Sequence, residues 1–192
     1  IDDLNEKRLD IVITSDVFSR SITSSRIKLV GIINLDVVLN SPSMDANHLA
    51  YSMLMHANNL IDNQTLVIQT YQPKHFVLKN FLINNYDNFY FEDLELRKAL
   101  KVEPFYEVNR ILVKGEYKDV FVVANNIKKT LLSLVKEDLF VIGPSYNYQE
   151  RCVQLIVKHK YEKIADIYNN IYNFYQKTNT TVIFDRYSKK LM

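Results

Sequence analysis

The chain has 192 residues, of which 47% are hydrophobic and 24% charged, a composition typical of a globular protein with a substantial core. No apolar run reaches the roughly 18–20 residues that a membrane helix needs. No secretory signal opens the sequence, and the single cysteine excludes an internal disulfide or a cysteine-based zinc site within this chain. We therefore expect a cytoplasmic protein with no membrane partner and no metal site of its own.

Charge is spread unevenly along the chain. Residues 1–106 contain 10 Lys and Arg and 13 Asp and Glu, which gives a net charge of −3. Residues 107–192 contain 14 Lys and Arg and 9 Asp and Glu, which gives a net charge of +5. Such an imbalance indicates a polyanion partner for the second half. Solvated lysines on a small domain would give the same numbers, so charge alone does not decide between the two.

The first half alternates short β-branched runs with helical patterns. Strands are predicted at residues 10–14, 27–35 and 65–70, and helices at 46–58, 74–84 and 85–100. Alternation of this kind predicts a parallel sheet covered by helices in three layers.

A joint between two structural parts follows at residues 95–105. Leu96, Ala99 and Leu100 fall at helical spacing, and Pro104 cannot continue a helix because it has no N–H. Proline also pushes the preceding residue towards extended geometry, so a helix ends here and a strand begins. We divide the chain accordingly into residues 1–72, a helical connector at 73–106 and a second domain at 107–192.

The second half has the pattern of a β-α-β-β-α-β unit. Its strands are expected at residues 107–115, 138–142, 151–158 and 180–185, and its helices at 118–136 and 161–176. Val120, Ile127 and Leu134 belong to an apolar stripe on the first of these helices, wide enough to cover one face of a four-stranded sheet. The predicted fold class is therefore α/β, with a parallel-sheet first part followed by a ferredoxin-like domain.

The strand at 151–158 indicates which side chains face away from the helices. The side towards the helices is apolar, with Val153, Leu155 and Val157. Gln154 and Lys158 should then lie on the open face, and Tyr146 and Tyr148 stand in the loop before the strand. Such a face is typical of single-stranded nucleic-acid binding, although a solvated face with incidental tyrosines explains the pattern equally.

Three segments of the first half resemble one protein family. Residues 14–31 align without a gap with the run GTQMIAKGHDFPNVTLVG, residues 33–49 with LDADLGLNSPDFRASER, and residues 67–75 with IIQTYNPEH. These runs are typical of the PriA family of bacterial primosomal replication-restart helicases. The resemblance implies that residues 1–72 form the C-terminal half of a RecA-like second helicase lobe, in a family that uses ATP, magnesium and zinc.

The motor residues of that family are altered in this chain. Thr14, Arg20 and Ser21 stand in the loop that contacts nucleotide and DNA, and Leu60 and Asn63 stand at the two arginine positions. Arginines at such positions stabilise charge on the transferred phosphoryl group. No phosphate-loop motif occurs in a chain with three glycines. We therefore expect no catalytic residue, no bound cofactor and no ATP hydrolysis by this chain.

The C-terminal domain of the family is similar as well. Val141-Ile-Gly-Pro144 and Gln154-Leu-Ile-Val157 look like its Gly-Pro strand and the strand that follows. The resemblance implies other primosome proteins as partners, together with the acidic tail of the single-stranded DNA-binding protein, held near Arg151 and Gln154. In a strict register the family's arginine falls on Glu150 instead.

Single-stranded or forked DNA is the nucleic-acid partner that the +5 charge of the second half and the open sheet face indicate, and the resemblance implies branched DNA. The side chains expected to hold it are Arg151, Lys158, Lys160, Lys163, Tyr146 and Tyr148. Lysine and arginine would contact phosphates, and a tyrosine would stack on a base. Two alternatives stay open: an RNA- or ribosome-associated ferredoxin-like binding module, and a purely architectural helicase remnant.

Overall fold

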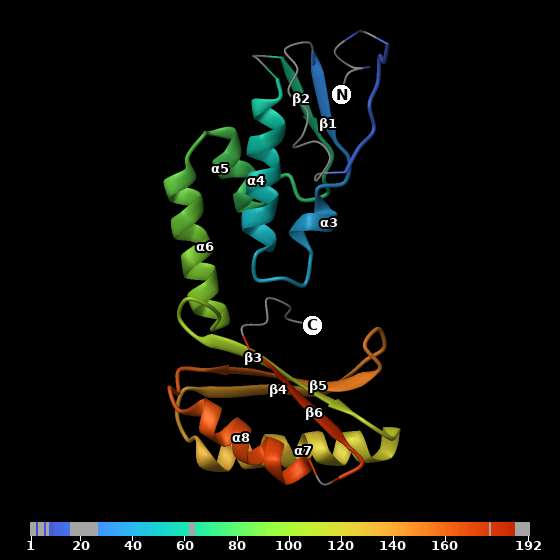
Figure 1. Ribbon diagram of the computed structural model, residues 1–192. Helices are drawn as coiled ribbons and strands as arrows, with labels where there is room; N and C mark the ends of the chain where they lie inside the picture. The colour runs from blue at the N-terminus through green and yellow to red at the C-terminus, as the bar shows by residue number, and fades with distance from the viewer. Residues whose placement is uncertain are drawn as a thin grey trace. The chain divides into compact units, whose positions relative to one another are not determined.

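The computed structural model describes residues 3, 6, 8–15, 27–61, 64–176 and 178–186, apart from the side chain of Tyr117. The chain divides into two compact units, Ile1–Leu94 and Glu95–Met192 (Figure 1). Among the described residues, no helix has both the length and the apolar character needed to cross a membrane.

The first unit is a small α/β layer. Its elements are β1 (Leu29–Ile32), α3 (Asp36–Leu39), α4 (Ala46–Asn59), β2 (Thr65–Ile68), α5 (Phe76–Leu82) and the start of α6 (Tyr86–Leu100). β1 and β2 pair in parallel, with Leu29 opposite Thr65. Leu35, Leu54 and Val77 are at the centre of a buried apolar cluster that holds the helices against the sheet.

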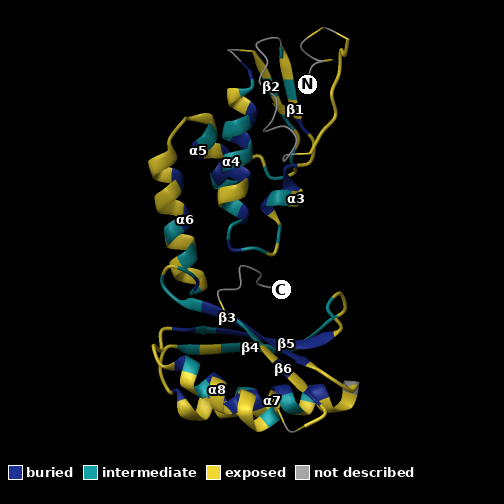
Figure 2. Ribbon diagram, in the orientation of Figure 1, coloured by how far each residue is buried: buried dark blue, intermediate teal, exposed yellow. Residues whose placement is uncertain are grey.

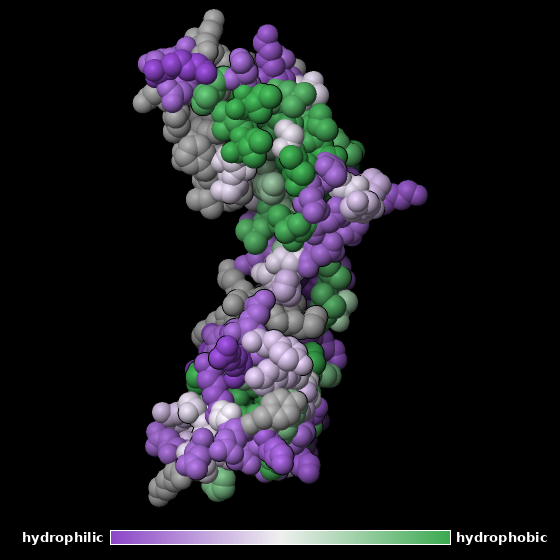
Figure 3. All heavy atoms as spheres, turned by 90° about the vertical axis from the view of Figure 1, so that its right-hand side faces the viewer, coloured by the Kyte–Doolittle hydropathy of each residue, from purple (hydrophilic) through white to green (hydrophobic). Residues whose placement is uncertain are grey.

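The other face of this two-stranded sheet is apolar and exposed. Val30, Ile32 and Leu66 contact the buried cluster, so Leu29 and Val67 point to the opposite side, where both are exposed. Figure 3 shows apolar atoms gathered on one face of this unit.

The strand predicted at residues 10–14 is wrong. Residues 11–15 have no regular secondary structure, and Ile13 is 91% exposed. A β-branched run favours extended geometry, but a strand also requires a paired neighbour and a face to bury. The described residues give this segment neither.

Asp36 links α3 to the segment that follows β2. Its carboxylate accepts hydrogen bonds from the Tyr71 N–H (2.9 Å), the Thr70 hydroxyl (3.1 Å) and Gln72 Nε2 (3.1 Å). These bonds, the Tyr71 N–H above all, hold the pKa of Asp36 below its ordinary value because they stabilise the charged form.

The second unit has the predicted β-α-β-β-α-β order. Its elements after α6 are β3 (Glu107–Lys114), α7 (Tyr117–Leu134), β4 (Leu139–Asn147), β5 (Cys152–His159), α8 (Ile164–Tyr175) and β6 (Thr181–Asp185). The sheet has the order β4-β5-β3-β6 and every pair is antiparallel. Both helices cover the same face (Figure 1), as the split β-α-β pattern requires. The α/β fold prediction is confirmed.

The core of the second unit lies between the sheet and the two helices. Ile111, Ile127, Leu131, Leu155 and Ile164 are fully buried there, and Figure 2 shows the inner sides of α7 and α8 buried while their outer sides are exposed. The apolar stripes of the two helices therefore pack against the apolar face of the sheet, as the sequence predicted.

β4 is longer than predicted, because a bulge lets the strand continue past Pro144. The register shifts between Ile142 and Ser145, which is the usual effect of an extra residue in one strand. Gly143 has φ +101°, a region that L side chains rarely adopt. Its carbonyl accepts a 2.6 Å hydrogen bond from Lys128 Nζ on α7, which fixes the bulge against the helix.

A buried polar network lies on the helix side of the sheet. Asn109 Oδ1 accepts the Tyr168 hydroxyl and contacts His159 Nε2, each at 2.9 Å, while Asn109 Nδ2 donates to Glu107 Oε1 at 3.0 Å. Burial lowers the pKa of His159 and raises the pKa of Tyr168, so both side chains are held neutral. The network fixes the Tyr168 ring in place.

Candidate nucleic-acid interface

The β4–β5 hairpin positions most of the side chains that the sequence assigned to DNA. Phe140 lies opposite Lys158, and Asn147 lies opposite Cys152. From Arg151 to Lys158 the strand advances about 23 Å at 3.3 Å per residue. The structure therefore separates the predicted residues into a turn group (Tyr146, Tyr148 and Arg151) and a group at the other end of β5.

Lysines and aromatic rings come together at the second of these ends. We call this set the lysine–aromatic cluster: Lys101, Tyr106, Phe140, Lys158 and Lys160. Lys101 Nζ lies 3.5 Å from the centroid of the Phe140 ring and Lys160 Nζ 4.6 Å from that of Tyr106. The two rings meet edge to face at 5.9 Å. Cation–π contacts of this kind hold the ammonium groups over the rings.

The cluster places its ammonium groups near a helix C-terminus and one carboxylate. Burial, and then the like charge of Lys101, hold the pKa of Lys158 below its ordinary value. Lys158 Nζ donates a 2.8 Å hydrogen bond to the Leu100 carbonyl at the end of α6, where the helix dipole is negative. The Asp138 carboxylate accepts a 2.7 Å hydrogen bond from the Tyr106 hydroxyl, and this bond raises the pKa of Tyr106. A phosphate between the lysines would relieve their mutual repulsion.

Lys163, which the sequence also assigned to DNA, is not a member of the cluster. It is the N-cap residue of α8 and its side chain is exposed. A cation at a helix N-terminus is unfavourable to the dipole, and the side chain of Lys163 makes no capping hydrogen bond to α8.

The turn group offers one exposed ring and one exposed cation. Tyr148 is 85% exposed, whereas Tyr146 packs partly against the core and meets Tyr148 edge to face at 5.0 Å. Arg151 is exposed, in the left-handed region at φ 50°. Asn147 Oδ1 accepts the N–H groups of Gln149 and Glu150, each at 3.0 Å, which shapes the turn.

The face of the sheet opposite the helices is not the solvated surface that the sequence suggested. Gln154 does lie on this face, but it is only 5% exposed and its Oε1 accepts from Asn147 Nδ2 at 3.3 Å. The other central positions are also buried: Val108, Arg110, Leu112, Cys152 and Ile156. Exposed large apolar side chains on this face belong to the outer strands, at Phe140, Ile142 and Ile183. The exposed part of this face is therefore its rim.

Arg110 is a charged residue that the sequence analysis missed. Its guanidinium contacts Glu150 Oε1 at 2.8 Å and Asp185 Oδ2 at 3.1 Å, joining β3 to the hairpin turn and to β6. Glu150 is the residue that a strict register aligns with the family's arginine. In this chain its carboxylate is paired with the buried guanidinium of Arg110. Strand alternation around Arg110 was the available signal, but its partners are 40 and 75 residues away.

The described residues contain no group of three or more His, Cys, Asp and Glu side chains that could hold a metal ion. Of the altered motor positions, Arg20, Ser21 and Asn63 lie outside the described residues, and Leu60 is a half-buried residue at the end of α4.

Comparison with known proteins supports the resemblance. No protein-family model matches the chain. Replication restart protein PriA of Borreliella burgdorferi is 29% identical over 123 residues, covering 60% of this chain and 19% of the relative. The PriA protein of Thermotoga maritima is 27% identical over 147 residues, 75% of this chain and 19% of the relative. That of Bacillus subtilis is 22% identical over 186 residues, 90% of this chain and 23% of the relative.

These matches agree with one another in name. Eight curated relatives, all PriA proteins, match 57–90% of the chain at 20–29% identity. The similarity to the PriA family that the motifs indicated is therefore confirmed, and it is consistent with a C-terminal part. The chain spans about a fifth of the length of the three relatives from Borreliella, Thermotoga and Bacillus.

Proposed function

We propose that this chain is the DNA- and protein-binding C-terminal portion of a PriA-like replication-restart component, without ATPase activity of its own. The observation that carries the proposal is the lysine–aromatic cluster. It combines three ammonium groups with two aromatic rings, the pairing of phosphate contact and base stacking that single-stranded nucleic acid requires.

The proposed DNA is single-stranded or forked, and the phosphate contacts come first. Lys101 and Lys160 hold their charges over aromatic rings, so they can exchange an aromatic contact for a phosphate at small cost. Arg151 and Tyr148, about 23 Å away along β5, would meet a second part of the same ligand. The absence of ATPase activity in this proposal rests on the sequence, at Leu60 and Asn63 and in the missing phosphate loop.

The double variant Lys101→Gln/Lys160→Gln tests the DNA proposal. We expect the slope of log affinity against log salt to fall by roughly 0.7–0.9 for each phosphate that is no longer neutralised by a lysine. Affinity for a fluorescein-labelled fork at low salt should fall by about an order of magnitude. Fluorescence anisotropy of the full chain at several salt concentrations measures both quantities.

The matched control is Lys129→Gln/Lys136→Gln, which removes the same charge from exposed positions on and just after α7. An equal loss in this control would mean that only net charge matters. No binding of the fork by the unaltered chain at low salt would contradict the proposal. Equal affinity for an RNA hairpin would favour the RNA-associated alternative.

The acidic tail of the single-stranded DNA-binding protein is proposed as the protein ligand of the turn group. The support is that Arg151 is exposed on the turn that leads into Gln154. A charge-assisted contact there is worth about 1.5–3 kcal/mol, so Arg151→Ala should weaken binding of a tail peptide roughly tenfold or more. Calorimetric titration with the peptide measures it, and Lys118→Ala, at another exposed position, is the control. Unchanged affinity in Arg151→Ala would remove Arg151 from this role.

A further inference from the structure

Among the described residues, β6 is an edge strand with a hydrogen-bonded neighbour on only one side of its backbone. In the order β4-β5-β3-β6 it pairs with β3 alone, from Thr181 opposite Lys114 to Asp185 opposite Arg110. In an antiparallel pair every second residue directs its N–H and C=O to the partner. The remaining residues of β6 direct theirs to the free edge, which is a template for another extended chain.

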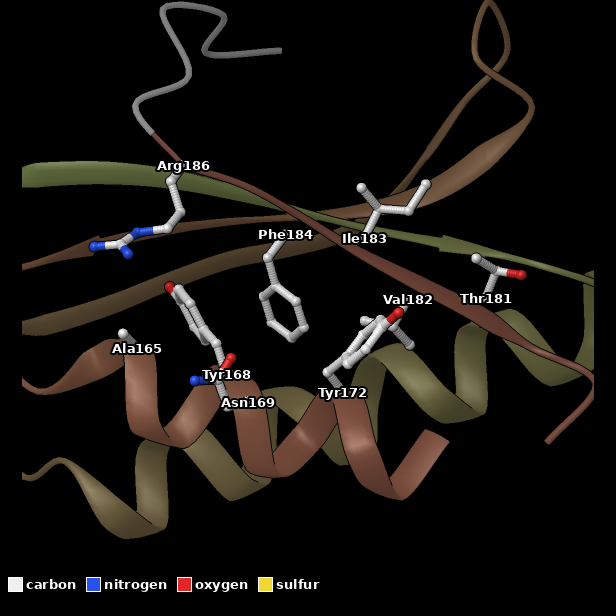
Figure 4. Close-up of a pocket in the computed structure, with 9 residues that line it drawn as sticks. All are labelled: Ala165, Tyr168, Asn169, Tyr172, Thr181, Val182, Ile183, Phe184 and Arg186. Atoms are coloured by element: carbon white, nitrogen blue, oxygen red, sulfur yellow. The ribbon is translucent and has the colours of Figure 1, made fainter. Parts of the chain in front are cut away.

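A groove of about 440 Å³ runs beside this free edge, between β6 and α8 (Figure 4). Val182 and Phe184 point from the strand towards the helix, and Tyr168 and Tyr172 point back from the helix. The rings of Tyr168 and Phe184 stack at 4.5 Å, and the buried hydrogen bond from Tyr168 to Asn109 keeps this wall in place. Tyr172 is 45% exposed at the rim, so it offers apolar area to a ligand.

The charge of the groove is low and of one sign. Of its nine lining residues, Arg186 alone is charged. Arg186 Nη2 lies 3.6 Å from Glu107 Oε1, and the side chain is exposed at the end of the groove. As the one cation of the lining, it would attract a carboxylate of a ligand.

We infer that the groove between β6 and α8 binds an extended segment of a partner protein as a fifth strand of the sheet. The segment places a large apolar side chain against Tyr172 and Phe184 and a carboxylate next to Arg186. Backbone hydrogen bonds supply affinity, and the pocket beside the strand supplies specificity. This goes beyond the proposed DNA binding, which uses the β4–β5 end of the sheet.

A peptide fits this groove better than a nucleic acid does. Nucleic-acid affinity comes largely from several cations on phosphates, and the lining has one. An extended peptide satisfies the free N–H and C=O groups of β6 in register, which a phosphate backbone cannot do.

The test uses a fluorescein-labelled seven-residue peptide that alternates valine or phenylalanine with threonine and carries one glutamate at an end. Versions with the glutamate at either end allow for both strand directions, and a version with alternate backbone N-methyl groups removes the strand hydrogen bonds. We expect one glutamate peptide to bind the full chain by fluorescence anisotropy and the N-methylated peptide to bind at least tenfold more weakly. Tyr172→Ala should weaken binding at least about fivefold.

Two variants provide matched readouts. Phe174→Ala removes an exposed aromatic ring from the same helix, where Phe174 lines a different hollow against α7, and should leave affinity unchanged. Arg186→Gln should weaken the glutamate peptide and leave its glutamine analogue unaffected, because only the former presents a carboxylate.

Several outcomes would overturn the inference. They are no binding of either glutamate peptide up to about 1 mM, equal binding of the N-methylated peptide, or an equal loss in Phe174→Ala. If the chain forms dimers and Ile183→Lys makes them dissociate, a second copy of the chain is the occupant of the edge. Displacement of the peptide by forked DNA, with Arg186→Gln weakening the DNA, would assign the groove to nucleic acid.

Discussion

Arg110→Ala should lose about 3 kcal/mol or more of the free energy of unfolding of the second unit. Arg110 is 7% exposed and holds Glu150 and Asp185 at 2.8 and 3.1 Å. Without it, two carboxylates remain close together with no cation between them. Because both acids are partly exposed, water screens them and the loss should fall near the lower end of the 3–5 kcal/mol seen for buried pairs. Urea denaturation measures it.

Two further variants are needed: an exposed lysine as the control, and a triple variant that separates the effect of unpaired charge from that of lost packing. Lys129→Ala, at an exposed position on α7, should change stability by less than about 0.5 kcal/mol. The triple variant Arg110→Met/Glu150→Gln/Asp185→Asn removes all three charges and should recover most of the loss, because a buried ion group can be replaced by a neutral set of similar size. If the triple variant were as unstable as Arg110→Ala, the loss of stability would come from the missing packing of the guanidinium group and not from the two unpaired carboxylates.

Gly143→Ala should cost the second unit about 2–4 kcal/mol. A Cβ at this position would lie 2.8 Å from the Gln154 carbonyl oxygen and 3.2 Å from the Ser145 nitrogen. Both are backbone atoms of the paired strands, so the hairpin itself would have to shift. The φ of +101° adds strain for any L side chain. The loss is measured by denaturation, and hydrogen exchange should show weaker protection at β4 and β5.

The chain offers a matched glycine as control. A Cβ on Gly31 in β1 would meet no atom within 4 Å, so Gly31→Ala should be neutral or stabilise the first unit by about 0.4–1 kcal/mol. A Gly143→Ala protein as stable as the unaltered chain would mean that the bulge relaxes at no cost, and that Gly143 is not needed to continue β4 past Pro144.

The parts of the fold that the sequence predicted are those set by local periodicity. All six elements from β3 to β6 were predicted, and the apolar stripes of α7 and α8 with the alternation in β5 predicted the face that the helices cover. The strand predicted at residues 138–142 ended too early, because a bulge held by Lys128 carries β4 through Gly143 and Pro144 to Asn147. The strand predicted at residues 10–14 is absent because β propensity alone does not supply the neighbouring strand that a sheet requires.

The candidate site was less predictable because it depends on contacts between distant residues. Lys158 and Lys160 were named from their charge, but Lys101, Tyr106 and Phe140 join them only through the β4–β5 register and the end of α6. Periodicity also cannot tell whether a polar residue on a sheet face is solvated. Gln154 faces away from the helices as expected, yet it is buried with Arg110 on the same face.

Each unit has a buried apolar cluster of its own, around Leu54 in the first and Leu155 in the second. Cooperativity in folding arises within such a core, and chains with more than one core depart from all-or-none behaviour. Loss of the sheet in the second unit, at Arg110 or Gly143, would therefore leave a folded first unit in the same molecule. A melting temperature quoted for the whole chain would combine two separate quantities, one belonging to each core.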